Sequence, residues 1–126
     1  MNQLLRDQGG TLVVMFVPSK SQVYLPLIAT GLSSAERDAA MRFLVPDNPP
    51  AFDTVYGHRH AMSDVVGELC AAEAIPFLDL ATPLEATVKA GRNAYFPDDS
   101  HWNAAGHEVA ARELSAFLRG RGLLTP

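Results

Sequence analysis

Two continuous apolar runs interrupt an otherwise mixed pattern of apolar and polar positions. Residues 11–17, TLVVMFV, and residues 75–80, IPFLDL, are rich in branched and aromatic side chains. Runs without alternation are typical of strands that are buried on both faces of a parallel sheet. Parallel strands need long crossover connections, which are usually helical, so the pattern predicts an α/β fold. Residues 53–56 are a weaker candidate for a third strand.

Helical patterns precede and separate the two runs. NQLLRDQGG at the N-terminus is typical of the last turns of a helix followed by glycine. Residues 33–44 begin with a capping box, because Ser33 is followed three positions later by Glu36. Residues 59–74 predict a helix that gathers apolar side chains on one face. These side chains are Met62, Val65, Val66, Leu69 and Ala72.

The C-terminal part of the chain predicts two more helices. In ATPLEATVKAGR we expect Thr82 to cap the helix, with Pro83 at its first position, Glu85 in a capping box and Gly91 at its end. The last helix is predicted at about residues 104–119, with Arg119 near its C-terminal dipole. Its buried face would contain Val109, Ala110, Leu114, Phe117 and Leu118.

Two segments fit neither pattern. SKSQVYLP, directly after Pro18, is expected to cross the edge of the sheet. VPDNPPAFDT is expected to form a proline-rich surface lobe near residues 45–60, because proline cannot donate to a central strand ladder. We predict one domain, residues 1–126. Two clear strands are few for a sheet that helices cover on both faces, so we expect part of a larger α/β domain.

Composition and charge exclude several classes of function. The net charge is −4 and the ten Lys and Arg residues are scattered, which argues against nucleic acid as a partner. The single cysteine, Cys70, allows no internal disulfide and is expected to be buried. No apolar run reaches the roughly 18 residues of a membrane span, and the N-terminus does not have the pattern of a signal peptide, which leaves the compartment open.

The richest chemistry lies in YFPDDSHWNAAGH, residues 95–107. A histidine that acts as a general base needs a carboxylate to fix its tautomer. Asp98 would give His101 a D-x-x-H spacing, and Asp99 would give it a D-x-H spacing. The alternative is structural: Asp98, Asp99, Ser100 and Asn103 are all residues that cap helices. Spacing alone leaves both interpretations open.

The segment, together with VVMFVPSKSQVYLP and IPFLDLATPLEA upstream, resembles the C-terminal half of a bacterial SGNH (GDSL-type) hydrolase. The D-x-H-W form is similar to that of relatives of alginate and other polysaccharide O-acetyltransferases. The resemblance implies a three-layer, flavodoxin-like parallel sheet, incomplete here at its N-terminus. It implies His101 as the base and Asp99 as its orienting acid, or Asp98 if the D-x-x-H form applies. We favour Asp99, because Trp102 and Asn103 follow as in the D-x-H-W form.

The sequence departs from that family at the nucleophile. Family hydrolases carry a serine in a Gly-Asp-Ser block near the N-terminus, and this sequence has no G-D-S. In the O-acetyltransferase relatives the serine lies well after D-x-H-W, whereas here no serine follows Ser115. We therefore expect the chain alone to be inactive or nearly so. Ser100 is expected to cap the last helix instead.

Further residues are candidates for substrate contact. Ser19 follows a strand, and the carboxyl ends of parallel strands are where α/β sheets bind ligands, so Ser19 is a candidate for substrate contact or for a substitute nucleophile. Lys20 beside it would lower a neighbouring pKa or hold a charged group. Trp102 is a further candidate for substrate contact. If the chain is a noncatalytic binding module, Trp102 and Tyr95 would offer stacking surfaces in its cleft. A plain turn after the strand is the alternative for Ser19 and Lys20.

Other polar residues predict no cofactor. His58 and His60 lack a third ligand for a metal, so we expect them at the surface of the lobe or at the rim of the cleft. His107 is expected to pack near the start of the last helix. Asp79 is expected to bond the turn at residues 81–82.

The sequence thus favours the C-terminal portion of a serine esterase or O-acyltransferase that acts on acetyl esters, often of carbohydrate. The expected partners are a small-molecule or glycan ester, and either a second copy or an N-terminal segment that carries the serine. One rival is a noncatalytic SGNH-like module that binds carbohydrate or protein. The other is a fragment without a function of its own.

Overall fold

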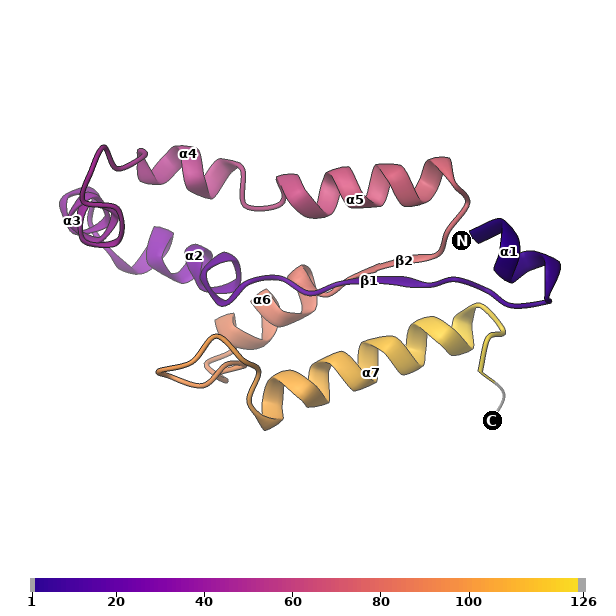
Figure 1. The fold of residues 1–126 in the computed structure, drawn as a ribbon. Helices are drawn as coiled ribbons and strands as arrows, with labels where there is room; N and C mark the ends of the chain where they lie inside the picture. Colours follow the sequence, from indigo (N-terminus) through magenta and orange to yellow (C-terminus); the bar gives the residue numbers. More distant parts are fainter. Residues whose placement is uncertain (1, 125–126) are drawn as a thin grey trace.

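The computed structural model describes residues 2–124, so Met1, Thr125 and Pro126 of the predicted domain lie outside it. Two short strands and seven helices follow one another along this part of the chain (Figure 1). Glycines with positive φ, Gly9 at 74° and Gly91 at 84°, follow two of the helices as predicted. The elements are α1 (Asn2–Asp7), β1 (Val14–Phe16), α2 (Lys20–Gly31), α3 (Ser34–Leu44), α4 (Phe52–Gly57), α5 (Ala61–Ala72), β2 (Phe77–Asp79), α6 (Ala81–Lys89) and α7 (Ala104–Gly120).

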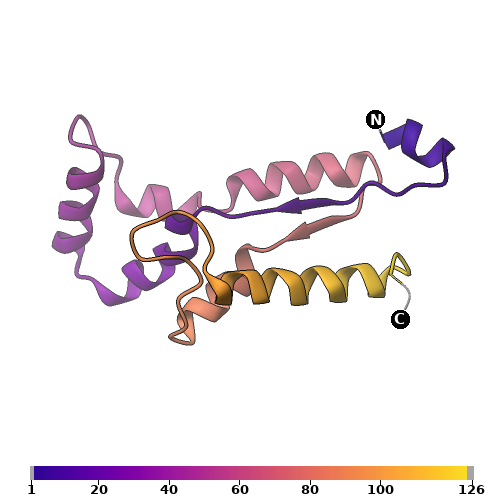
Figure 2. The same cartoon turned by 60° about the horizontal axis from the view of Figure 1, so that its bottom comes forward.

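The two strands pair in parallel, which confirms the α/β prediction. Val14 pairs with Phe77 and Phe16 pairs with Asp79. Helices α5 and α7 run along opposite sides of the strand pair (Figures 1 and 2). The described residues form a sheet of two strands only, so the complete three-layer, flavodoxin-like sheet remains a prediction.

The main core lies where α2, α6 and α7 meet the ends of the strands. Leu80 and Leu84 are fully buried, and Val23 and Val109 are 1% exposed. This cluster also contains Tyr95, which belongs to the loop between α6 and α7. The core therefore reaches the segment that carries the candidate chemistry.

The proline-rich lobe contains a helix where the sequence offered a third strand. Residues 53–56 lie within α4, so that prediction is wrong. Phe52, Val55 and Tyr56 have the spacing of one helical face, and they join Leu25 and Met41 in a second, smaller core. The helical period explains why these side chains can all face the same neighbours.

The segment SKSQVYLP does not cross the edge of the sheet as an irregular connection, because it forms most of α2. Ser19 caps this helix, its side chain accepting from the Gln22 N–H at 3.2 Å. Pro26 lies inside the helix, and proline usually ends a helical pattern. That proline, and a buried face that includes the polar Gln22, conceal α2 in the sequence.

Helix α5 forms as predicted, but its apolar face is turned to solvent. Met62, Val65 and Leu69 are 65%, 53% and 63% exposed. The positions buried on this helix are Ser63 and Cys70. Cys70 is thus the buried cysteine that the sequence predicted, whereas the apolar face remains uncovered within the part of the chain described.

Candidate active site

The candidate site is a loop that the chain closes on itself between α6 and α7. Tyr95 and Trp102 form an antiparallel bridge, and the Phe96 N–H donates to the His101 carbonyl at 3.1 Å. The Asn103 N–H donates to the Ala94 carbonyl at 3.1 Å. These contacts bring the two ends of the loop together and leave residues 97–100 at its tip.

Within this loop the structure pairs His101 with Asp99. One carboxylate oxygen of Asp99, Oδ1, lies 2.5 Å from His101 Nδ1 and accepts from the His101 backbone N–H at 2.8 Å. Hydrogen bonds from that N–H and from the ring lower the pKa of the Asp99 carboxyl below its ordinary value of 3.8. The bond to Nδ1 leaves Nε2 of the exposed ring for a substrate or nucleophile.

Asp98 is exposed, and its side chain makes no hydrogen bond to any described residue. The geometry therefore agrees with the D-x-H interpretation, while the catalytic roles of Asp98, Asp99 and His101 stay predictions. Asp99 lies two positions before His101, so the hydrogen bond from the His101 N–H to the Asp99 carboxylate closes a local turn. This bond holds the Asp99 side chain against the backbone of its own loop.

Asn103, not Ser100, caps the last helix, so the prediction for Ser100 is wrong. The Asn103 side-chain oxygen accepts from the Ala105 and Gly106 N–H groups at 2.9 and 3.2 Å. Its amide donates to the Asn93 and Tyr95 carbonyls at 2.9 and 3.1 Å. The Asn103 side chain thus connects the start of α7 to Asn93, just before the loop, and to Tyr95, at the bridge that closes it.

A cavity of about 220 Å³ opens beside His101 at the end of β1. Its lining consists of Val17, Pro18, Tyr95, Ser100, His101, Trp102 and His107. Trp102 is half-buried, and the His107 ring packs edge-on against it with centroids 5.6 Å apart, as expected for a packing role. The indole Nε1 is buried without a hydrogen-bond partner among the described residues.

Tyr95 is not a free stacking surface. Its side chain is 2% exposed and its hydroxyl donates to the Pro18 carbonyl at 2.8 Å. Burial raises the pKa of the Tyr95 hydroxyl. The prediction that Tyr95 would stack on a ligand is therefore wrong. Tyr95 lines the cavity with its buried ring, whereas Trp102 lines it with a half-buried one.

Ser19 and Lys20 lie at the start of α2, directly after the turn that follows β1. The Ser19 hydroxyl caps the helix and contacts the Ser21 hydroxyl at 2.9 Å. Ser19 also lines a second cavity, of about 300 Å³, next to Ser21, Gln22, Leu25, Val55, His58 and Arg59. The Lys20 Nζ lies 2.6, 2.7 and 3.1 Å from the carbonyl oxygens of Phe96, Pro97 and Asp99. Substrate contact by either residue stays a prediction, as it does for Trp102.

No serine hydroxyl in residues 2–124 is hydrogen-bonded to the His101 ring. Ser100 lines the same cavity but sits beside His101 in the chain, and Ser19 is committed to its cap. The nucleophile therefore remains unassigned.

An ionic contact that the sequence did not predict joins α6 to the connection between α4 and α5. Glu85 is 7% exposed, and its Oε1 lies 3.5 Å from Arg59 Nε and 3.3 Å from His60 Nε2.

The predicted cap at Thr82 and the predicted capping box with Glu85 are wrong, because α6 starts earlier, at Ala81. There the Asp79 carboxylate accepts from the Ala81 N–H at 2.8 Å, as expected for Asp79.

The two lobe histidines do not form a metal site within the described residues. His58 Nδ1 contacts the Thr54 carbonyl at 2.7 Å and the ring is exposed at the end of α4, whereas His60 faces Glu85. No group of three or more potential metal ligands occurs among residues 2–124.

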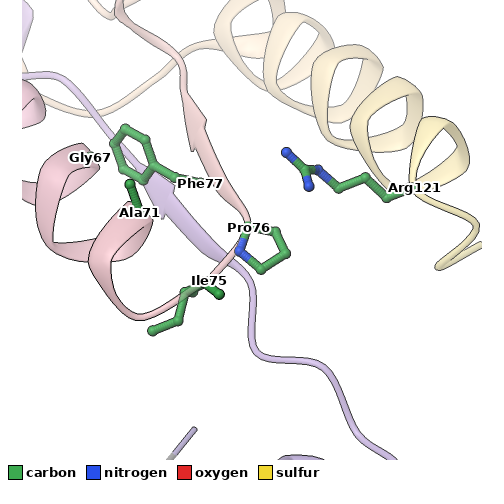
Figure 3. Close-up of a pocket in the computed structure, with 7 residues that line it drawn as sticks. Gly67, Ala71, Ile75, Pro76, Phe77 and Arg121 are labelled. Atoms are coloured by element: carbon green, nitrogen blue, oxygen red, sulfur yellow. The ribbon is translucent and has the colours of Figure 1, made fainter.

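A larger cavity lies away from this chemistry. It has about 440 Å³ and is lined by α5, by residues 74–77 before and within β2, and by Arg121 (Figure 3). It opens at the amino end of β2, whereas α/β sheets bind ligands outside the carboxyl ends of their strands. The smaller cavity beside His101 is therefore the better candidate site.

In the part of the chain that the structure describes, no helix is both long enough and apolar enough to span a bilayer.

Comparison with known proteins gives the context for this geometry. Residues 1–125 match the family model described as SGNH hydrolase-like domain, acetyltransferase AlgX. The chain is 31% identical over 121 residues to the probable alginate O-acetylase AlgJ of Pseudomonas putida, an alignment that covers 95% of the chain and 25% of that relative. It is 29% identical over 116 residues to the probable alginate O-acetylase AlgJ of Pseudomonas syringae pv. tomato, covering 90% of the chain and 23% of that relative.

The chain thus spans about a quarter of the length of these curated relatives. No solved structure matches it significantly. The family match extends over almost every residue and includes the loop that holds Asp99 and His101. The chain belongs to the family of SGNH hydrolase-like domains represented by acetyltransferase AlgX.

Proposed function

We propose that this chain supplies the acid–base half of an O-acetyltransfer site. The observation that carries the proposal is the Asp99–His101 hydrogen bond at the edge of a cavity beside the end of β1. Membership in the family and similarity to two probable alginate O-acetylases support acetyl transfer as the reaction class. Acetyl esters of carbohydrate are the proposed substrates.

In the proposed mechanism a serine hydroxyl attacks the ester carbonyl. His101 Nε2 takes the hydroxyl proton, and the protonated ring then gives that proton to the leaving alcohol. Asp99 holds Nδ1–H and stabilises the imidazolium. Attack of an acceptor alcohol on the acetyl-serine, assisted by the same ring, completes transfer. These steps need no metal or organic cofactor.

The serine would come from another part of a longer polypeptide or from another chain. The absence of a G-D-S block, together with a His101 ring that no described serine contacts, supports this origin. Trp102 and Ser19 are the proposed substrate contacts, and the proposed partners are an ester substrate and the segment that carries the serine. Nucleic acid is not among them.

The test measures acetyl transfer by the complete gene product and by the 126-residue chain. We expect the complete product to release p-nitrophenol from p-nitrophenyl acetate. His101→Ala and Asp99→Asn should lower kcat about 100-fold or more. Asp98→Asn and His58→Ala are the matched controls, and we expect both within about two-fold of wild type. The chain alone should stay near the uncatalysed rate.

Turnover that survives His101→Ala in the complete product would sink the proposal. Turnover by the isolated chain that His101→Ala removes would instead place the nucleophile within these residues. A noncatalytic glycan-binding module, the rival interpretation, predicts binding that His101→Ala leaves intact and Trp102→Ala abolishes.

A further inference from the structure

The ammonium group of Lys20 is hydrogen-bonded to the backbone of the candidate catalytic loop. Its three backbone acceptors are the carbonyls of Phe96, Pro97 and Asp99, at 2.6, 2.7 and 3.1 Å. A lysine ammonium has three N–H donors and no acceptor. Each of its three donors therefore has a backbone acceptor in the loop. The other lysine, Lys89, is exposed at the end of α6 and makes no side-chain hydrogen bond to the described residues.

The loop has little other support at its tip. The His101 and Asp99 side chains are 82% and 48% exposed. Exposed ion pairs hold their geometry weakly, because water screens the attraction and the side chains lose conformational freedom. The pair of Asp99 and His101 alone would not keep residues 97–100 in one conformation.

Asp99 is the residue at which the two sets of contacts meet. Its carbonyl accepts from Lys20, and its carboxylate accepts from the backbone and ring of His101. A second bond ties the segment just before α2 to the loop, since the Tyr95 hydroxyl donates to the Pro18 carbonyl. The start of α2 thus fixes the backbone from which the carboxylate projects.

We propose that Lys20 is a positioning residue that holds the Asp99 backbone so that its carboxylate stays on His101 Nδ1. The proposal assigns Lys20 to the loop rather than to the substrate, and it rests on the proposed role of His101 as base. A charged donor is suited to this task because it forms stronger hydrogen bonds to carbonyl oxygens than a neutral donor does.

The first measurement needs no substitution. Hydrogen bonding slows the exchange of ammonium protons with water, so proton–nitrogen spectra of the wild-type chain at low temperature should contain a Lys20 Nζ signal. Lys89 is the internal reference and should give no such signal. A Lys20 ammonium that exchanges as fast as that of Lys89 would overturn the proposal.

The second measurement compares Lys20→Met with Lys89→Met by nuclear magnetic resonance. At about pH 8, where histidines are mostly neutral, the wild-type His101 ring should carry its proton on Nδ1. In Lys20→Met it should shift toward the Nε2–H form that free imidazole favours. The pKa of the Asp99 carboxyl should rise toward its ordinary value in Lys20→Met only, because the donors that lower it are no longer held.

Chemical rescue separates positioning from a general loss of structure. Lys20→Cys treated with 2-bromoethylamine forms a thioether that restores the ammonium, with bromide as the leaving group. Cys70 is 5% exposed, and wild type treated in the same way controls for its alkylation. The rescued protein should regain the Nδ1–H tautomer. A folded Lys20→Met whose tautomer and Asp99 titration match wild type would overturn the proposal.

These signals do not depend on ester turnover, so the proposal and the proposed function fail separately. If the complete gene product turns over ester, Lys20→Met should lower kcat about 10- to 100-fold and leave KM nearly unchanged. A rise in KM with unchanged kcat would assign Lys20 to the substrate instead and contradict positioning.

Discussion

At the scale of single residues, the adjacent acids Asp98 and Asp99 make different contacts because they occupy different positions in the loop. The Asp99 carboxylate reaches both the backbone N–H and the ring of His101, whereas Asp98 projects without a partner in the described chain. In this loop His101 therefore pairs with Asp99, whose carboxylate reaches it across a local turn, and not with Asp98. Local hydrogen bonding distinguishes Asp99 from Asp98, and the long-range contact of Lys20 with the Asp99 carbonyl supports that geometry.

The lowered pKa of Asp99 gives a pH dependence with a defined sign. A carboxyl whose pKa is lower in the folded state stabilises that state above the unfolded value, and the stabilisation disappears as pH falls through the folded value. We expect the His101 N–H to be protected from hydrogen exchange above pH 3.8, the ordinary Asp value, and to lose protection as the pH falls further, through the lowered pKa of Asp99. Asp99→Asn should remove this pH dependence, while Asp98→Asn should keep it. Protection that does not change on acidification would contradict the assignment.

Gly106 is the residue at which α7 approaches the loop most closely. A Cβ at this position would lie 2.3 Å from the Ala94 carbonyl oxygen and 2.9 Å from the Trp102 Cβ. Neither neighbour can move freely, because both belong to the closure of the loop. We expect Gly106→Ala to lower the free energy of unfolding by about 1–3 kcal/mol, as overpacking does.

Urea denaturation measures this loss. Gly120→Ala on the same helix is the matched control, since a Cβ there meets nothing within 4 Å. The control should be neutral or slightly stabilising. Equal unfolding midpoints for the two variants would show that the contact at Gly106 relaxes without cost.

At the scale of elements, the start of α7 is coupled to the loop through Asn103. Asn103→Ala removes two accepted and two donated hydrogen bonds. We expect it to cost about 1–2 kcal/mol of stability and to shift the His101 resonances as well. Ser33→Ala at the cap of α3 is the matched control, which should destabilise its own helix and leave those resonances unchanged. Equal effects of the two variants on His101 would argue against the coupling.

The sequence predicts best those elements that are marked by local signals, such as capping residues or continuous apolar runs. The capping box of Ser33 and Glu36 fixes the start of α3, and the continuous apolar runs locate both strands. Helix α2 escapes prediction because its buried face depends on two different cores and because Pro26 lies inside it. The contact of Lys20 with residues 96–99 joins parts of the chain far apart in sequence, and no local pattern encodes it.

At the scale of the whole molecule, the described chain leaves apolar surface uncovered. Met62, Val65 and Leu69 form the exposed apolar face of α5, although their spacing is that of a buried helix face. In this chain a neighbouring side of α5 packs on the strands instead. Exposed apolar patches favour association, because contact removes them from water.

We therefore expect the isolated 126-residue chain to self-associate through this face as its concentration rises. Val65→Lys combined with Leu69→Lys should shift it toward monomer, and light scattering or sedimentation velocity measures the change. Ala86→Lys combined with Ala116→Lys is a control at exposed positions with the same change in charge, from −4 to −2 (−4 plus two lysines). Because a smaller net charge by itself promotes association, dissociation only in the α5 variant would identify the apolar face as the cause. Equal association of both variants and wild type would exclude it.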